Sequence, residues 1–76
     1  MSSPSRDDFA FPTVFYEYGE EQPLYTDSAR LVVPANGTGV LLPDGTRYKV
    51  VDSWLSYDKD DKLGAGMHVF VEPVQP

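Results

Sequence analysis

The 76-residue chain contains no cysteine, which excludes a disulfide framework and every zinc site that uses thiolate ligands. It has a single histidine, His68, which leaves too few imidazole ligands for the usual mixed zinc sites. A chain of this length forms one domain and buries only about 60% of the surface that its unfolded state exposes. Its stability must therefore come from an apolar core, for which one tryptophan, five tyrosines and four phenylalanines are available.

Long apolar runs are also missing. No stretch approaches the roughly 18 apolar residues of a membrane-spanning helix, so we expect no membrane association. Residues 1–12 contain two prolines and two aspartates and lack the apolar segment of an export signal. Together with the absence of cysteine, this predicts a cytoplasmic protein.

Positive charge is scarce. Six lysines and arginines oppose twelve acidic residues, for a net charge of −6. Within residues 1–28, six acidic side chains accompany Arg6 alone, whereas residues 29–76 are close to neutral. Phosphate backbones repel such a surface, which disfavours direct nucleic-acid binding. A basic partner and simple solubility both remain explanations of the acidity.

The order of residue types divides the chain into an arm and one domain. Residues 1–12, rich in serine, proline and aspartate, are expected to form a flexible N-terminal arm, and residues 13–76 a single small β-barrel domain. Residues 13–18 are β-branched and aromatic, which predicts a strand, and residues 24–26 can return beside it. Residues 29–33 and 38–42 are two further apolar stretches, separated by Pro34 and by an expected turn at Asn36 and Gly37.

The strongest local signal is the sequence Pro43-Asp44-Gly45 between two apolar stretches. Proline, aspartate and glycine in this order predict a type I turn followed by a glycine bulge, which closes a hairpin. The strand after it is expected to run from Arg47 to about Tyr57. Its apolar residues fall on both faces, which is typical of a bent or bulged strand: Tyr48, Val50 and Trp54 would share one face, and Val51, Leu55 and Tyr57 the other. Residues 67–72 form the expected closing strand, ended by Pro73.

No window of ten residues favours an amphipathic helix, and prolines divide the chain at hairpin-like intervals. The expected fold class is therefore all-β, as a small SH3-like barrel or a rolled antiparallel sheet of five or six short strands.

No catalytic residue, cofactor site or metal site is predicted. Asp58, Asp60 and Asp61 lack the glutamate that would complete a calcium loop, so we interpret residues 58–62 as a solvated loop. His68 has no nucleophile or base in a suitable context and is expected to be a surface or half-buried structural residue. No glycine-rich phosphate loop is present either.

Five residues are candidates for binding a partner. Asp52 lies inside the long strand, where a structural role is the first interpretation and a functional one the alternative. Trp54 is interpreted first as a core residue and alternatively as an interface anchor, and Tyr57 as either. Glu20 and Glu21 belong to the acidic part of the chain and would suit a basic partner.

Residues 42–52, followed by Trp54 and by residues 68–74, resemble segments of small uncharacterised β-barrel proteins of actinobacteria and their phages. The resemblance implies a bacterial or phage origin and does not indicate any activity. It places the protein in the cytoplasm of a bacterial or phage-infected cell, or in a virion.

Residues 40–50 are also similar to a strand segment of bacterial and phage ADP-ribosyltransferases. Those enzymes carry their catalytic Glu-x-Glu pair just before this segment, where Thr38 and Gly39 stand here. We therefore interpret the similarity as convergence: unrelated chains use the same residues to form a β-hairpin.

The leading hypothesis is a non-enzymatic protein–protein interaction module that contacts a host protein or a virion component and can form homo-oligomers. The alternative is an acidic decoy that inhibits a DNA-binding protein by occupying its basic groove.

Overall fold

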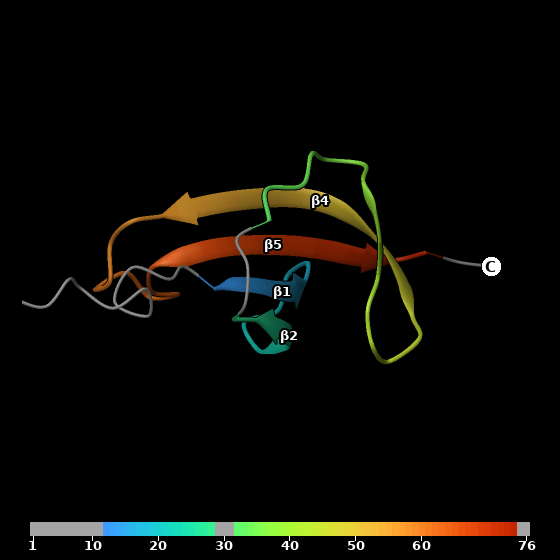
Figure 1. Ribbon diagram of the computed structural model, residues 1–76, viewed down its shortest axis with the longest axis horizontal. Helices are drawn as coiled ribbons and strands as arrows, with labels where there is room; N and C mark the ends of the chain where they lie inside the picture. Colours follow the sequence, from blue (N-terminus) through green and yellow to red (C-terminus); the bar gives the residue numbers. More distant parts are fainter. Residues whose placement is uncertain (1–11, 29–31, 75–76) are drawn as a thin grey trace, which may run out of the picture.

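The computed structural model describes residues 12–28 and 32–74, and the predicted arm therefore lies almost wholly outside the described residues. Five strands form one curled, mixed sheet that makes a half-barrel (Figure 1). They are β1 (Thr13–Glu17), β2 (Pro23–Asp27), β3 (Gly39–Leu41), β4 (Arg47–Ser56) and β5 (Gly66–Pro73), in the spatial order β2-β1-β5-β4-β3. The prediction of an all-β fold is confirmed.

The centre of the sheet is a parallel pair of strands, which corrects the expectation of a purely antiparallel sheet. β1 and β5 run in the same direction, from Thr13 opposite Met67 to Glu17 opposite Val71. The pairing begins where the Met67 N–H donates to the Pro12 carbonyl at 2.9 Å. Gly66 permits this approach, because a Cβ there would lie 2.8 Å from the Pro12 carbonyl oxygen. Both central strands are buried on their two faces, as parallel strands usually are.

The predicted hairpin between β3 and β4 is confirmed. The Gly45 N–H donates to the Leu42 carbonyl at 2.9 Å, and Gly45 has a φ of 84°. Asp44 stabilises the turn by accepting the Thr46 N–H at 2.8 Å. The turn at Asn36 and Gly37 also forms, but residues 32–35 add no strand, and residues 29–31 lie outside the described part.

A bulge in β4 decides which face each of its side chains occupies. The register against β5 shifts between Val50 and Asp52, as the mixed pattern of the strand predicted. Tyr48, Val50 and Leu55 therefore share one face, and Trp54 lies on the other, because paired residues point to the same side. The predicted grouping of Trp54 with Tyr48 and Val50 is wrong, since the extra residue reverses the alternation.

The apolar core lies on one face of the sheet, here called the core face. Its buried members come from β1, β4, β5 and the hairpin turn: Phe15, Leu42, Tyr48, Val50, Met67, Val69 and Val71. The opposite face, here called the second face, carries the even-numbered residues of β5 and, after the bulge, Asp52 and Trp54 of β4. The second face contains two of the five predicted site residues, Asp52 and Trp54.

Candidate functional site

Two cross-strand rows of side chains organise the second face. Trp54 on β4 lies opposite His68 on β5, which lies opposite Val14 on β1. In the next row Asp52 lies opposite Phe70, which lies opposite Tyr16. The rings of Tyr16 and Phe70 stack with centroids 5.1 Å apart. Aromatic residues therefore run across the sheet from the buried β1 to the exposed end of β4.

The centre of the second face is a buried pair, Tyr16 and His68. Their side chains are joined by a hydrogen bond of 2.9 Å between the Tyr16 hydroxyl and His68 Nδ1. His68 Nε2 lies 2.8 Å from the Gly64 carbonyl, which can only accept, so Nε2 carries the proton and Nδ1 accepts from Tyr16. Burial raises the pKa of the Tyr16 phenol above its ordinary value of 10.0.

The position of His68 corrects its predicted placement at or near the surface. The residue is 1% exposed, Tyr16 is 3% exposed, and both imidazole nitrogens are engaged. A substrate cannot reach either group, and neither nitrogen is available to take a proton from one. The pair holds the loop of residues 57–65 against the sheet through Gly64, which is a structural role.

Trp54 is the most exposed large hydrophobic residue of β4, and its interpretation as a core residue is wrong. Trp54 is 66% exposed, yet its indole Nε1–H donates to Asp52 Oδ2 at 3.1 Å. The other carboxylate oxygen of Asp52 accepts the Ser53 N–H at 2.9 Å. Asp52 thus links the backbone of the strand to the indole through its two carboxylate oxygens.

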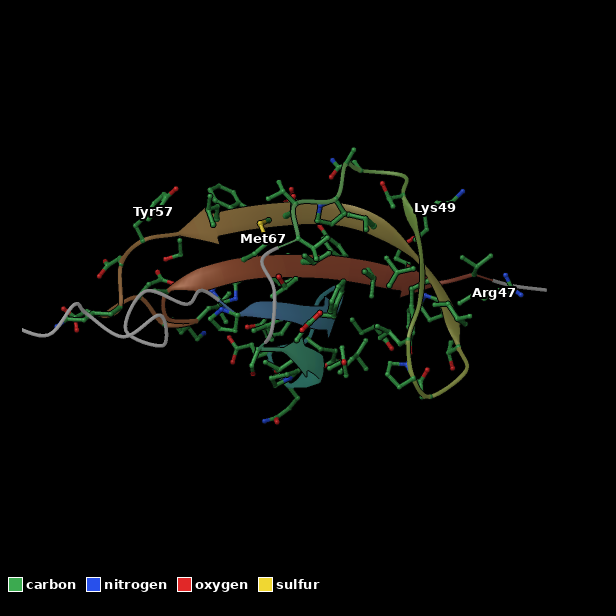
Figure 2. The ribbon with its side chains drawn as sticks, viewed as in Figure 1. Arg47, Lys49, Tyr57 and Met67 are labelled. Atoms are coloured by element: carbon green, nitrogen blue, oxygen red, sulfur yellow. The ribbon has the colours of Figure 1, made fainter. Side chains whose placement is uncertain are left out.

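Leu55 and Tyr57 extend the exposed apolar surface beyond Trp54. Leu55 is 38% exposed on the core face, and Tyr57, which follows the end of β4, is 74% exposed. Figure 2 shows the Tyr57 ring projecting beyond the sheet at the end opposite Arg47. We call Asp52, Trp54, Leu55 and Tyr57 the β4 tip. It combines three of the five predicted residues with Leu55, which is not among the five.

Glu20 and Glu21 lie apart from these residues, in the turn between β1 and β2. Glu20 is exposed, and its backbone N–H donates to the Glu17 carbonyl at 2.9 Å. Glu21 forms an exposed ion pair with Lys62 of the 57–65 loop. The hydrogen bond and charge of Glu21 raise the pKa of Lys62. The structure therefore ties Glu21 to the loop that follows the β4 tip, and leaves Glu20 outside the site.

A groove lies at the other end of the sheet from the β4 tip. It has a volume of about 370 Å³, and its lining comes from β3, the start of β4 and the end of the described chain: Gly39, Val40, Leu41, Arg47, Tyr48 and Val74. Arg47 is the only charged residue in this lining, and Figure 2 shows it at the end of the sheet away from Tyr57. The groove and the β4 tip are thus separate surfaces.

The aspartates of the loop after β4 are engaged in local turns. Asp58 Oδ1 accepts the Asp60 N–H at 2.9 Å, and Asp61 Oδ2 accepts the Leu63 N–H at 3.0 Å. Across residues 12–28 and 32–74, no three histidine, cysteine or acidic side chains gather as metal ligands would. The same part of the chain contains no helix that is long and apolar enough to cross a membrane.

The chain was compared with known proteins on three levels. No family model matches it, and neither the curated proteins nor the solved structures give a match. The site is therefore assigned from its own geometry.

Proposed function

We propose that this protein is a non-enzymatic protein-binding module whose contact surface is the β4 tip. The observation that carries the proposal is the indole of Trp54, which is exposed and at the same time fixed by Asp52. Tryptophan is the side chain most enriched among the residues that dominate binding energies at interfaces. A ring already held in one orientation loses little freedom when a partner covers it.

The neighbours of Trp54 support the same function. Leu55 and Tyr57 place further exposed apolar area around the ring. Aromatic residues are enriched at protein interfaces, and a rim of less critical contacts around an aromatic anchor excludes water from it. The β4 tip thus has the composition of a small interface centre.

A binding function also agrees with the state of the one imidazole. His68 is buried with both ring nitrogens engaged, so it contributes to the fold and not to a reactive centre. The acidic composition of the chain favours a partner with basic residues. Since Glu21 is paired with Lys62, the ion pair lends no support to an acidic decoy.

We further propose that the partner is a host protein or a virion component, and that the protein is of bacterial or phage origin and acts in the cytoplasm or the virion. These proposals rest on the resemblance of residues 42–52 and 68–74 to small actinobacterial and phage proteins. The finer assignment of the half-barrel as SH3-like also stays a prediction.

The experiment is capture of partners from an actinobacterial lysate, infected and uninfected, with immobilised wild-type protein and two variants. Trp54→Ala removes the anchor. Tyr18→Ala is the matched control, because Tyr18 is an aromatic residue that is 57% exposed and lies outside the β4 tip, just after β1. We expect a protein that is retained by the wild type and by Tyr18→Ala and is lost with Trp54→Ala. Equal retention by all three would contradict the proposal.

A further inference from the structure

The second half of β4 is an open sheet edge among the described residues. β3 pairs with β4 only from Gly39 opposite Lys49 to Leu41 opposite Arg47. Two backbone bonds at Val50, with Gly37 and Thr38, continue the contact by one residue. In Figure 1 β5 lies along one side of β4, and no labelled strand lies along its other side between this point and its arrowhead. Such an edge is a ready template for another extended chain.

The direction of the backbone groups at this edge follows from the bonds around it. The Val71 carbonyl accepts from Tyr18 and the Met67 N–H donates to Pro12, so the odd-numbered residues of β5 face β1 and the even-numbered ones face β4. His68 and Phe70 are therefore the backbone partners of Trp54 and Asp52. Backbone direction alternates along a strand, so Ser53 and Leu55 point their backbone groups to the open side.

Asp52 closes only part of this edge. Its carboxylate takes the Ser53 N–H, which agrees with the outward direction of that group. The Ser53 carbonyl and the N–H and carbonyl of Leu55 remain directed outward. The Trp54 side chain stands on one side of this short row and the Leu55 side chain on the other. An added strand would therefore lie between an aromatic and an aliphatic contact.

The negative charge of the residues around this edge favours a basic chain as its partner. Between Asp52 and Asp61 the chain carries four aspartates and one lysine. A second copy would bring the same excess of negative charge to the same edge, which opposes pairing between two copies. A basic chain is attracted to it, and a lysine or arginine above an indole gains a cation–π interaction.

We propose, building on the function proposed above, that the β4 tip binds an extended basic peptide segment of its partner by strand addition. The segment forms backbone hydrogen bonds with Ser53 and Leu55. Its basic side chains lie over Trp54 on the second face, and its alternate apolar side chains contact Leu55 on the core face.

The test is titration of the full chain with the capped peptide Lys-Val-Lys-Val-Lys-Val, followed by the amide and indole N–H resonances in NMR spectra. We expect the largest shifts at Leu55 and Trp54. The capped peptide Glu-Val-Glu-Val-Glu-Val has the same alternation and the opposite charge, and we expect it not to bind. Sedimentation of the free protein over the same concentrations should show a monomer, and a dimer that involves Leu55 would overturn the proposal.

Substitution of Leu55 separates backbone pairing from side-chain contact. Leu55→Pro removes the outward N–H and should weaken binding of the lysine peptide by about tenfold or more, because proline is tolerated at an edge but cannot donate there. Leu55→Val keeps the N–H and should change binding by less than about threefold. If Leu55→Pro fails to fold, a lysine peptide with N-methylated valines gives the same test on the unchanged protein, and we expect it not to bind.

The outcomes distinguish this inference from the proposed function. Trp54→Ala should weaken peptide binding by about 30-fold, the value for loss of an interface anchor. If Trp54→Ala weakens binding while Leu55→Pro or the N-methylated peptide has no effect, strand addition is wrong and the contact surface stands. If the lysine peptide does not bind at all, the basic-peptide inference is overturned, and the capture experiment decides the function separately.

Discussion

The carboxylate of Asp52 accepts the indole N–H of Trp54 at 3.1 Å, two residues along the same strand and on the same face of the sheet. Residues two apart in a strand share a face, and the bulge between Val50 and Asp52 places this pair on the second face and not on the core face. An exposed tryptophan without such a partner would sample several rotamers. Here the hydrogen bond to Asp52 favours one orientation of the ring.

Asp52→Ala should loosen the ring of Trp54 with little effect on the fold. The lost hydrogen bonds are at least partly accessible to water, so we expect the free energy of unfolding to fall by less than about 1 kcal/mol. The fluorescence anisotropy of Trp54, which is the only tryptophan of the chain, should decrease. Asp60→Ala, in the loop after β4, is the control and should leave the anisotropy unchanged. Unchanged anisotropy in Asp52→Ala would show that the carboxylate does not restrain the indole.

Tyr16→Phe should destabilise the protein by about 1–3 kcal/mol, because it leaves Nδ1 of the buried His68 without a donor. Urea unfolding measures this change. In a double-mutant cycle with His68→Leu, the sum of the losses of unfolding free energy in the two single variants should exceed the loss in the double variant by at least about 0.5 kcal/mol. Tyr48→Phe is the control with a smaller expected loss, since the Tyr48 hydroxyl lies 3.3 Å from Asp44 in a partly exposed setting. Strictly additive losses for Tyr16 and His68 would contradict their coupling.

Stability should fall at alkaline pH through two tyrosines. Burial raises the pKa of Tyr16, and burial followed by the charge of Asp44 raises the pKa of Tyr48. The folded state therefore favours the protonated phenols, so this contribution is fully present below pH 10.0 and is lost as the pH rises above it. Urea unfolding at a series of pH values should show the decline, and Tyr16→Phe should make it shallower. An identical slope in Tyr16→Phe would contradict the raised pKa of Tyr16.

Two glycines with positive φ should differ in their tolerance of alanine. Gly45 has open space where a Cβ would lie, so Gly45→Ala should cost only the backbone strain, about 1–2 kcal/mol. Gly66→Ala adds a clash with the Pro12 carbonyl oxygen and should cost at least about 2 kcal/mol. Thermal unfolding compares the two variants directly. A smaller loss for Gly66→Ala than for Gly45→Ala would contradict the close approach of β1 and β5.

The features that could be predicted from sequence are local. Pro43, Asp44 and Gly45 specify their turn by their own backbone preferences, and the mixed pattern of the following strand indicated a bulge. The exact place of the bulge could not be predicted, because several neighbouring residues would give a similar pattern. A displacement of one residue reverses the faces, and for this reason the predicted grouping of Trp54 with Tyr48 and Val50 is wrong.

The buried pair of Tyr16 and His68 could not be predicted for a different reason. The two residues are 52 positions apart and meet through the parallel pairing of β1 with β5, which no local pattern specifies. The open edge at Ser53 and Leu55 likewise depends on where β3 stops pairing with β4. Both features of the site are products of strand order and register.

The most direct test of the account is the fluorescence of Trp54 during titration with the protein captured from the lysate. The chain has no other tryptophan, so with a tryptophan-free segment of the partner the fluorescence reports on this ring alone. Burial of the ring shifts its emission to shorter wavelength and protects it from quenching by acrylamide. Both changes should saturate together with binding, and Asp52→Ala should bind the partner with lower affinity than the wild type. Saturating binding that leaves the emission and quenching of Trp54 unchanged would contradict the assignment of the β4 tip as the contact surface.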